Sequence, residues 1–225
     1  MANAPDTVYV SFAAEVNQTT TEGLLGLCAN LANQGIKTVY LLISSLGGSV
    51  TNGITIYNVL RAMPFKLVTH NVGSVNSIAN LIFLAGETRY STPNSTFMFH
   101  GVGFDVIQAM RFEEKNLRER LDSIVADQRK IGAIISERSS LKPEEVQELF
   151  REAVTRDPGY AKEKGIIHDI IEARIPPGAT VHQLVFKRSA YSPDSAGGPR
   201  PSQGPGRTCP QQRRAVSPGP TEARE

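Results

Sequence analysis

The residues best suited to chemistry in this 225-residue sequence lie in short segments that combine glycine with serine. Ser77 stands within 73–80, between a predicted strand and an apolar helix, a setting that exposes a serine hydroxyl beside the next N–H group. Gly47 and Gly48 also lie between a predicted strand and a helix, where glycines permit a positive φ and N–H groups suit a developing negative charge. A serine hydroxyl together with such N–H groups favours nucleophilic attack on a carbonyl group. Taken separately, Ser77 also fits the N-cap of a helix, and the two glycines also fit a plain tight turn.

A histidine in the segment 93–101 supplies the residue type that a serine nucleophile needs. His100 ends a predicted strand just before Gly101, where its imidazole is placed to act as a general base toward a serine. The alternative is a lone structural histidine. We predict structural roles for the other three histidines, because none has a nucleophile pattern around it: His70, His168 and His182.

The elements that must position these segments alternate between strand and helix. Alternating or continuous apolar runs predict strands at 8–12, 38–44, 66–72, 96–100 and 166–171. Apolar residues at helical spacing predict helices at 19–32, 50–63, 77–84, 142–154 and 158–164. The run 38–44 is nearly all apolar, as in a strand buried on both faces. Repeated β-α-β units of this kind predict an α/β domain.

A longer helix is predicted over 105–138, which has no proline and one apolar stripe. The stripe consists of Ile107, Met110, Leu117, Leu121, Ile124, Val125, Ile131 and Ile135. A helix of about 30 residues is too long for so small a domain to cover at 1.5 Å per residue. We therefore expect part of the stripe to pack on another subunit; the alternative is a helix lying along its own sheet.

Composition separates a domain from a tail. Hydrophobic residues make up 40% of the chain and charged residues 20%, as in a globular protein. Residues 189–225 hold 7 of the 14 prolines without apolar periodicity, so they are predicted to form a disordered tail after a domain at 1–188.

Charge and cysteine content exclude several functions. The formal net charge of +2 gives no basic field for nucleic-acid binding. No apolar run is long enough for a membrane span, and the first residues lack a secretory pattern, so a cytoplasmic location is expected. Cys28 and Cys209 form neither a disulfide framework nor a metal-ligand spacing, and we predict no metal or other cofactor.

In order and spacing, the three segments resemble the proteolytic subunit of the Clp protease family, a serine peptidase on the crotonase-like fold. The family's Ser-Pro-Gly-Gly turn corresponds to Ser45-Leu46-Gly47-Gly48, its Gly-x-x-x-Ser to Gly73 through Ser77, and its Pro-Asn-Ser before the histidine to Pro93-Asn94-Ser95. The resemblance covers about residues 8–175. It implies an α/β, ClpP-type fold of repeated β-β-α/β-α-β units, with the long helix as a protruding handle between stacked rings.

The resemblance also implies roles for particular residues. Ser77 would be the nucleophile, His100 the general base, and the backbone N–H groups of Gly48 and Ile78 the oxyanion hole. The family's aspartate position falls on Ala153, whose methyl group cannot orient an imidazole. Two acidic residues nearby are alternatives for the third member, Glu152 and Asp157, although Asp157 also fits a helix N-cap before a proline. A Ser-His dyad is a further alternative.

The function implied is a serine endopeptidase that cleaves unfolded polypeptides inside a homo-oligomeric chamber. The family also implies an ATP-driven (AAA+) unfoldase as partner. The family's segment before the first strand helps to dock the unfoldase, and this segment is expected to be nearly absent here, since the first predicted strand already includes Tyr9. Two other functions stay open. One is a catalytically weak or inactive ring subunit, suggested by Ala153. The other is a crotonase-type acyl-CoA enzyme, which would use similar glycine-rich turns but usually carboxylates.

Overall fold

The computed structural model describes residues 6–103 and 111–186. The chain divides into two units, Met1–Lys187 and Arg188–Glu225, and everything below concerns the first. The predicted tail at 189–225 and the first part of the predicted long helix, 105–110, both lie outside the described residues. The disordered tail therefore stays a prediction.

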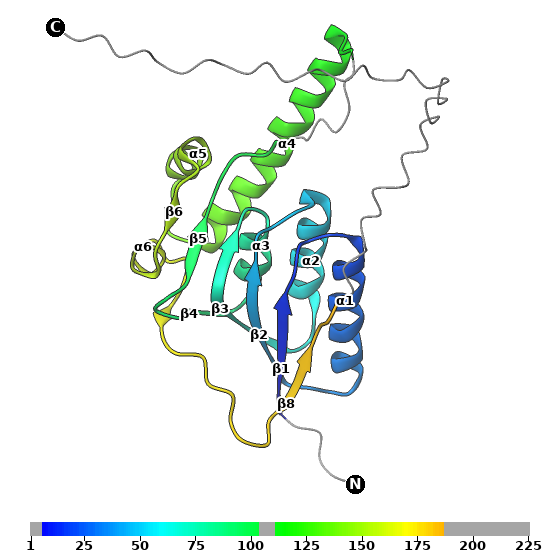
Figure 1. Ribbon diagram of the computed structural model, residues 1–225, viewed down its shortest axis with the longest axis vertical. Helices are drawn as coiled ribbons and strands as arrows, with labels where there is room; N and C mark the ends of the chain where they lie inside the picture. The colour runs from blue at the N-terminus through cyan, green and yellow to red at the C-terminus, as the bar shows by residue number, and fades with distance from the viewer. Residues whose placement is uncertain (1–5, 104–110, 187–225) are drawn as a thin grey trace, which may run out of the picture. The chain divides into compact units, whose positions relative to one another are not determined.

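An eight-stranded sheet forms the centre of the first unit, with the order β6-β5-β3-β2-β1-β8, and β4 pairs with β3 and β7 (Figure 1). All pairings are parallel except that between β5 and β6. The strands are β1 (Thr7–Ala13), β2 (Thr38–Ser45), β3 (Lys66–Asn76), β4 (Thr88–Ser91), β5 (Thr96–Met98), β6 (Thr155–Arg156), β7 (Asp169–Ile170) and β8 (Thr180–Gln183).

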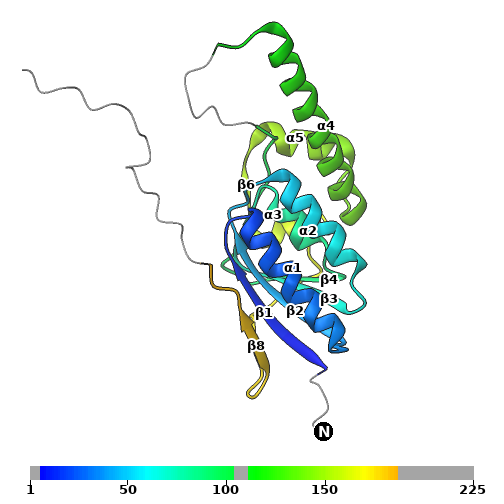
Figure 2. The ribbon, with the colours of Figure 1, turned by 90° about the vertical axis from the view of Figure 1, so that its right-hand side faces the viewer.

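Six helices join these strands in the described part of the chain. They are α1 (Gln18–Asn33), α2 (Val50–Ala62), α3 (Ala79–Leu84), α4 (Glu114–Arg138), α5 (Pro143–Glu152) and α6 (Pro158–Glu163). Figure 2 shows α1 and α2 together on one face of β1, β2 and β3. The predicted alternation of strand and helix is confirmed. None of the helices within residues 6–103 and 111–186 is both long and apolar enough to cross a membrane.

Burial of the central strand β2 differs from the prediction for 38–44. Its residues alternate between buried and half-buried, so Val39 and Leu41 face the helices while Tyr40 and Leu42 lie on the other face. The prediction of burial on both faces was wrong because α1 and α2 cover only one face of this part of the sheet.

Three boundaries differ from the predictions close to Ser77 and His100. Strand β3 continues past residue 72 to Asn76, α3 begins at Ala79 instead of residue 77, and β5 ends at Met98 instead of residue 100. Ser77 sets where β3 ends and where α3 begins, because its left-handed backbone, with φ 56°, separates the strand from the helix. Ser77 and His100 thus stand just outside regular elements, where their side chains are not committed to packing.

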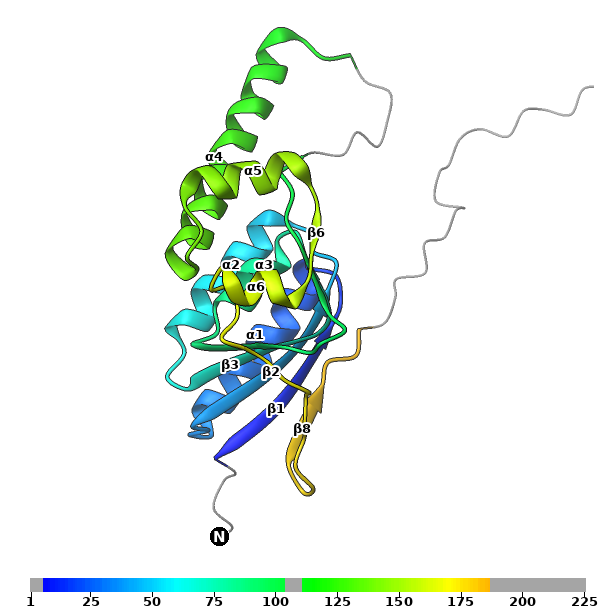
Figure 3. The same ribbon diagram turned by 90° about the vertical axis from the view of Figure 1, so that its left-hand side faces the viewer.

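The long helix α4 is shorter than predicted. It begins at Glu114, and residues 111–113 are not helical, so the prediction of a helix from residue 105 was wrong for this stretch. Its C-terminal part contacts α3 and α5 and buries Ile131 and Ile135. Its N-terminal part extends past the sheet (Figure 3) and leaves three members of the apolar stripe about half exposed, Leu117, Leu121 and Val125.

His70 has the structural role predicted for it. The side chain is fully buried in β3 between the rings of Tyr40 and Tyr90. Its Nδ1 shares a 2.7 Å hydrogen bond with the Tyr40 hydroxyl, and Nε2 lies 3.1 Å from the carbonyl oxygen of Ile171. The ring therefore ties the segment after β7 to the middle of the sheet.

This buried histidine predicts a loss of stability in mild acid. Burial lowers the pKa of His70 below 6.5, partly opposed by the hydrogen bond to Ile171 and by the nearby Glu172 carboxylate. The unfolded chain takes up a proton near pH 6.5 while the folded chain stays neutral, so stability is complete above that pH and falls below it.

Urea unfolding between about pH 7.5 and pH 5 measures the effect, which is at most about 1.4 kcal/mol per pH unit for one histidine. The His70→Gln variant should show a shallower decline than the unmodified protein, even if it is less stable throughout. Equal slopes in the two proteins would contradict the prediction.

Candidate active site

One pocket of about 300 Å³ brings together the four residues predicted for the reaction centre. Ser77, His100, Gly48 and Ile78 all line it, although they come from separate segments of the chain. The remaining lining is mostly apolar and includes Leu46, Val50, Phe99, Val102, Ile131, Ile135 and Phe150. The pocket therefore places a hydroxyl, an imidazole and backbone amides beside an apolar cavity.

Ser77 is held by its backbone, which leaves its side chain available. Its N–H donates to the carbonyl of Met98 at 2.8 Å, joining the end of β3 to the end of β5. The amide of the fully buried Asn80 donates to the carbonyls of both Ser77 and Met98, at 3.0 and 2.9 Å. Helix α3 has no side-chain cap, so the alternative of Ser77 as a helix N-cap was wrong. A left-handed, non-glycine residue at a pocket is typical of a strained functional turn.

The glycine turn before α2 needs glycine at both positions. Gly47 and Gly48 have φ of 96° and 143°. A Cβ on Gly48 would lie 2.3 Å from the carbonyl oxygen of Val16, and one on Gly47 would lie 2.7 Å from Cβ of Ser77. The tight-turn alternative is therefore too simple, since this turn also approaches Ser77 closely.

Two hydrogen bonds fix the direction of this turn. The N–H of Val16 donates to the carbonyl of Gly47, and the N–H of Ser49 donates to the carbonyl of Val16, both at 2.8 Å. These bonds, made by the residues before and after Gly48, bind the turn to Val16. The N–H group of Gly48 itself takes part in neither bond. Within the described part of the chain, neither the Gly48 nor the Ile78 N–H donates a hydrogen bond. Both amides border the pocket and are available to an oxyanion.

His100 is exposed at the mouth of the pocket, two residues beyond β5. The next residue anchors it, because the N–H of Gly101 donates to the carbonyl of Phe150 at 3.1 Å and so ties this segment to α5. No hydrogen bond between the Ser77 hydroxyl and His100 occurs among the contacts of the described residues. Such bonds often tighten only when substrate is bound.

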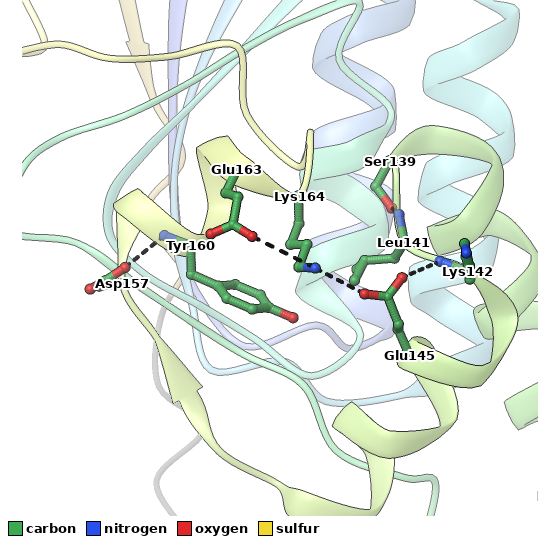
Figure 4. Close-up of polar contacts among 8 residues, drawn as sticks. All are labelled: Ser139, Leu141, Lys142, Glu145, Asp157, Tyr160, Glu163 and Lys164. Carbon is green, nitrogen blue, oxygen red and sulfur yellow. Dashed lines mark hydrogen bonds and ion pairs between the residues drawn. The ribbon is translucent and has the colours of Figure 1, made fainter.

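The acidic residues proposed as a third member are engaged elsewhere. Oδ1 of Asp157 accepts a 2.8 Å hydrogen bond from the N–H of Tyr160 and caps α6, as Figure 4 shows, so its predicted N-cap role is confirmed. Glu152 pairs with Arg156 at 2.5 Å. Ala153 ends α5 with a left-handed φ of 51°. None of the three lines the pocket that holds Ser77 and His100.

Some functional residues could not be found from the sequence. Asn80 is the single polar residue in the six-residue helix α3. A polar residue in an otherwise apolar helix was the only signal in the sequence for its hydrogen bond to Ser77. Phe150 had no such signal, because it reaches the pocket from a helix predicted only by its apolar spacing. Within the described ranges, no group of three or more His, Cys, Asp or Glu side chains is placed to hold a metal ion.

The fold and this site define a Clp-type mixed α/β protein with a long helix consistent with a handle. The model of the Clp protease family matches residues 3–174, and the chain belongs to this family.

Solved structures with a similar fold include ClpP proteins of two organisms. A point mutant of ClpP1 from Listeria monocytogenes has a TM-score of 0.66 at 24% identity, covering 75% of this chain and 92% of that one. ClpP1 from Listeria monocytogenes has a TM-score of 0.63 at 26% identity, with the same coverage. The ClpP protease catalytic domain from Plasmodium falciparum has a TM-score of 0.63 at 22% identity, covering 75% and 87%.

Proposed function

We propose that this protein is a serine endopeptidase that cleaves unfolded polypeptides by a Ser-His mechanism. The observation that carries the proposal is the single pocket in which Ser77, His100 and the amides of Gly48 and Ile78 meet. Membership of the Clp protease family supports the same activity. A serine hydroxyl is a poor nucleophile at neutral pH, so it requires both a base and a preorganised oxyanion site.

The mechanism assigns one task to each group. Oγ of Ser77 attacks the peptide carbonyl carbon while His100 accepts the hydroxyl proton. The N–H groups of Gly48 and Ile78 donate to the carbonyl oxygen as it becomes an oxyanion. The intermediate collapses, the C–N bond breaks, and His100 gives its proton to the leaving amine. Water, deprotonated by His100, then hydrolyses the Ser77 ester and restores the free hydroxyl.

Cleavage within a chain is supported by two further hollows that adjoin this pocket. One neighbouring hollow shares Leu46 and Gly48 with it, and another shares Gly48, Val50, Val102 and Gly103. These hollows give an extended polypeptide room beyond the pocket of Ser77 itself. The apolar wall of Ile131, Ile135 and Phe150 suits an apolar side chain next to that bond.

We propose that the site works as a Ser-His dyad, because Asp157 and Glu152 are held by other partners. Without a carboxylate nothing fixes the tautomer of His100 or stabilises its imidazolium, and catalysis is slower than in a complete triad. The Ala153→Asp substitution should raise kcat at least tenfold, since loss of a triad aspartate costs about 10⁴ in rate. Aspartate tolerates the left-handed conformation of this position.

Steady-state hydrolysis of a fluorogenic peptide measures this gain, with Ala153→Asn as the matched control. Asparagine also tolerates the left-handed conformation but carries no charge, so it should give a smaller gain. Equal rates for the aspartate variant and the unmodified protein would show that position 153 does not reach His100.

Fluorophosphonate labelling tests the proposal itself. An adduct should form on Ser77, identified by peptide mass spectrometry, and should be lost or slowed at least tenfold in the His100→Ala variant. Absence of any labelling of the unmodified protein would support the second candidate, a structural ring subunit without activity. Labelling at another serine would instead show that Ser77 is not the nucleophile. Ala153 at the expected aspartate position favours that second candidate.

A homo-oligomer of stacked rings, with polypeptides as substrates, completes the proposal. The exposed apolar residues of α4 support a second subunit at this helix. An ATP-driven unfoldase is the partner that family membership suggests.

A further inference from the structure

A hollow of about 500 Å³ adjoins the pocket of Ser77 on the other side of the glycine turn. It is lined by the end of β1 and the residues after it, by the end of β2, and by the turn itself: Ala13, Ala14, Glu15, Ser44, Ser45, Leu46, Gly47 and Gly48. Leu46 and Gly48 line both cavities, so the hollow and the pocket are neighbours across the turn. The Leu46 side chain between them is 75% exposed. A polypeptide seated with its carbonyl at Gly48 would pass over Leu46 into this hollow.

The charge of the hollow has one sign. Glu15 is the single ionisable residue among those that line it. The other hollow that adjoins the pocket differs, because Arg120 and Asp127 line it together and their charges are opposite. Among the ion pairs of the described residues, Glu15 takes part in none. A substrate therefore meets a negative charge in this hollow that no neighbouring cation neutralises by direct pairing.

Hydrogen bonds hold the backbone of Glu15 next to the glycine turn. Its carbonyl accepts a 2.7 Å hydrogen bond from the hydroxyl of Thr20, at the start of α1. The next residue, Val16, makes the two backbone hydrogen bonds that hold the turn of Gly48. The backbone that carries the Glu15 side chain is therefore held beside the proposed oxyanion site, while the side chain itself is exposed to water.

We infer that Glu15 is a specificity-determining residue that favours a lysine or arginine of the polypeptide on one side of the scissile bond. The inference rests on the proposed peptidase function. The occupant is a cationic side chain because a carboxylate attracts an ammonium or guanidinium group and repels a carboxylate. Both partners are exposed, so the preference should be about two- to fivefold in kcat/KM. It should weaken as salt rises.

The test is cleavage of a synthetic peptide library, with the cut sites read by mass spectrometry. The unmodified protein should show enrichment of Lys and Arg on one side of the cut only. Glu15→Gln should remove this enrichment, and Glu15→Lys should replace it with enrichment of Asp and Glu. The matched control is Glu22→Gln on α1, which removes an exposed carboxylate outside the hollow and should leave the enrichment unchanged.

Two failures are distinguishable in this experiment. If the unmodified protein cuts the library without enrichment of basic residues, or if Glu15→Gln keeps that enrichment, the inference about Glu15 is overturned while the peptidase function stands. If no Ser77-dependent cleavage occurs, with Ser77→Ala as the reference, the proposed function fails and the inference fails with it.

Discussion

Replacing Ser77 by alanine should reduce peptide hydrolysis to less than about a hundredth of the unmodified rate while the fold stays intact. Loss of even one oxyanion donor costs about 10²–10³ in rate, and loss of the nucleophile removes the acyl-enzyme route altogether. The change should leave the fold intact because the Ser77 contacts that hold the turn, to Met98 and Asn80, are made by its backbone. Initial rates with a fluorogenic peptide, together with the melting temperature, measure both parts.

Ser74→Ala is the matched control for this prediction. Ser74 lies three residues earlier, in β3, and its hydroxyl bonds to that of Thr96 at 3.1 Å instead of lining the pocket. This variant should keep activity within a few-fold of the unmodified protein. Residual hydrolysis above about a hundredth in Ser77→Ala, at an unchanged melting temperature, would point to another nucleophile.

The grouping of Ser77, His100 and Gly48 could be predicted from the sequence for a physical reason. Each follows a strand, and the carboxyl ends of neighbouring parallel strands meet at one edge of a sheet. The observed pairing of β2 with β3 and of β3 with β5 places all three at that edge.

Other parts of the site depend on contacts between distant segments, which spacing along the chain does not reveal. The left-handed Ser77 is bonded through its N–H to Met98 on another strand, and the apolar wall includes Phe150 from α5. The N-cap role of Asp157 could be predicted as one alternative, since a proline after an acidic residue indicates the start of a helix. The start of α4 at Glu114 was not visible, because the apolar pattern continues on both sides of it.

The long helix α4 gives the second large expected effect, which concerns the assembly of subunits. Leu117, Leu121 and Val125 stand at intervals of four residues on α4 and are 49%, 59% and 47% exposed. Burying a large apolar side chain fully contributes about 1.5–3 kcal/mol, so covering this row by a second subunit is strongly favourable. We predict a homo-oligomer that the double change Leu117→Asp and Leu121→Asp dissociates, with activity reduced at least tenfold. Neither residue lines the pocket of Ser77, so a fall in activity would come through assembly.

Analytical ultracentrifugation at micromolar concentration measures the assembly, alongside peptide hydrolysis. The matched control, Asn116→Asp with Ala126→Asp, adds the same two charges to exposed positions of α4 beside the apolar row. It should keep the oligomer, because carboxylates on a solvated helix face bury no apolar surface and displace none. If the unmodified protein sediments as a monomer with full activity, the exposed row does not hold subunits together. If the control dissociates as readily as the apolar-row variant, added charge on the helix is the cause, and loss of apolar burial is not.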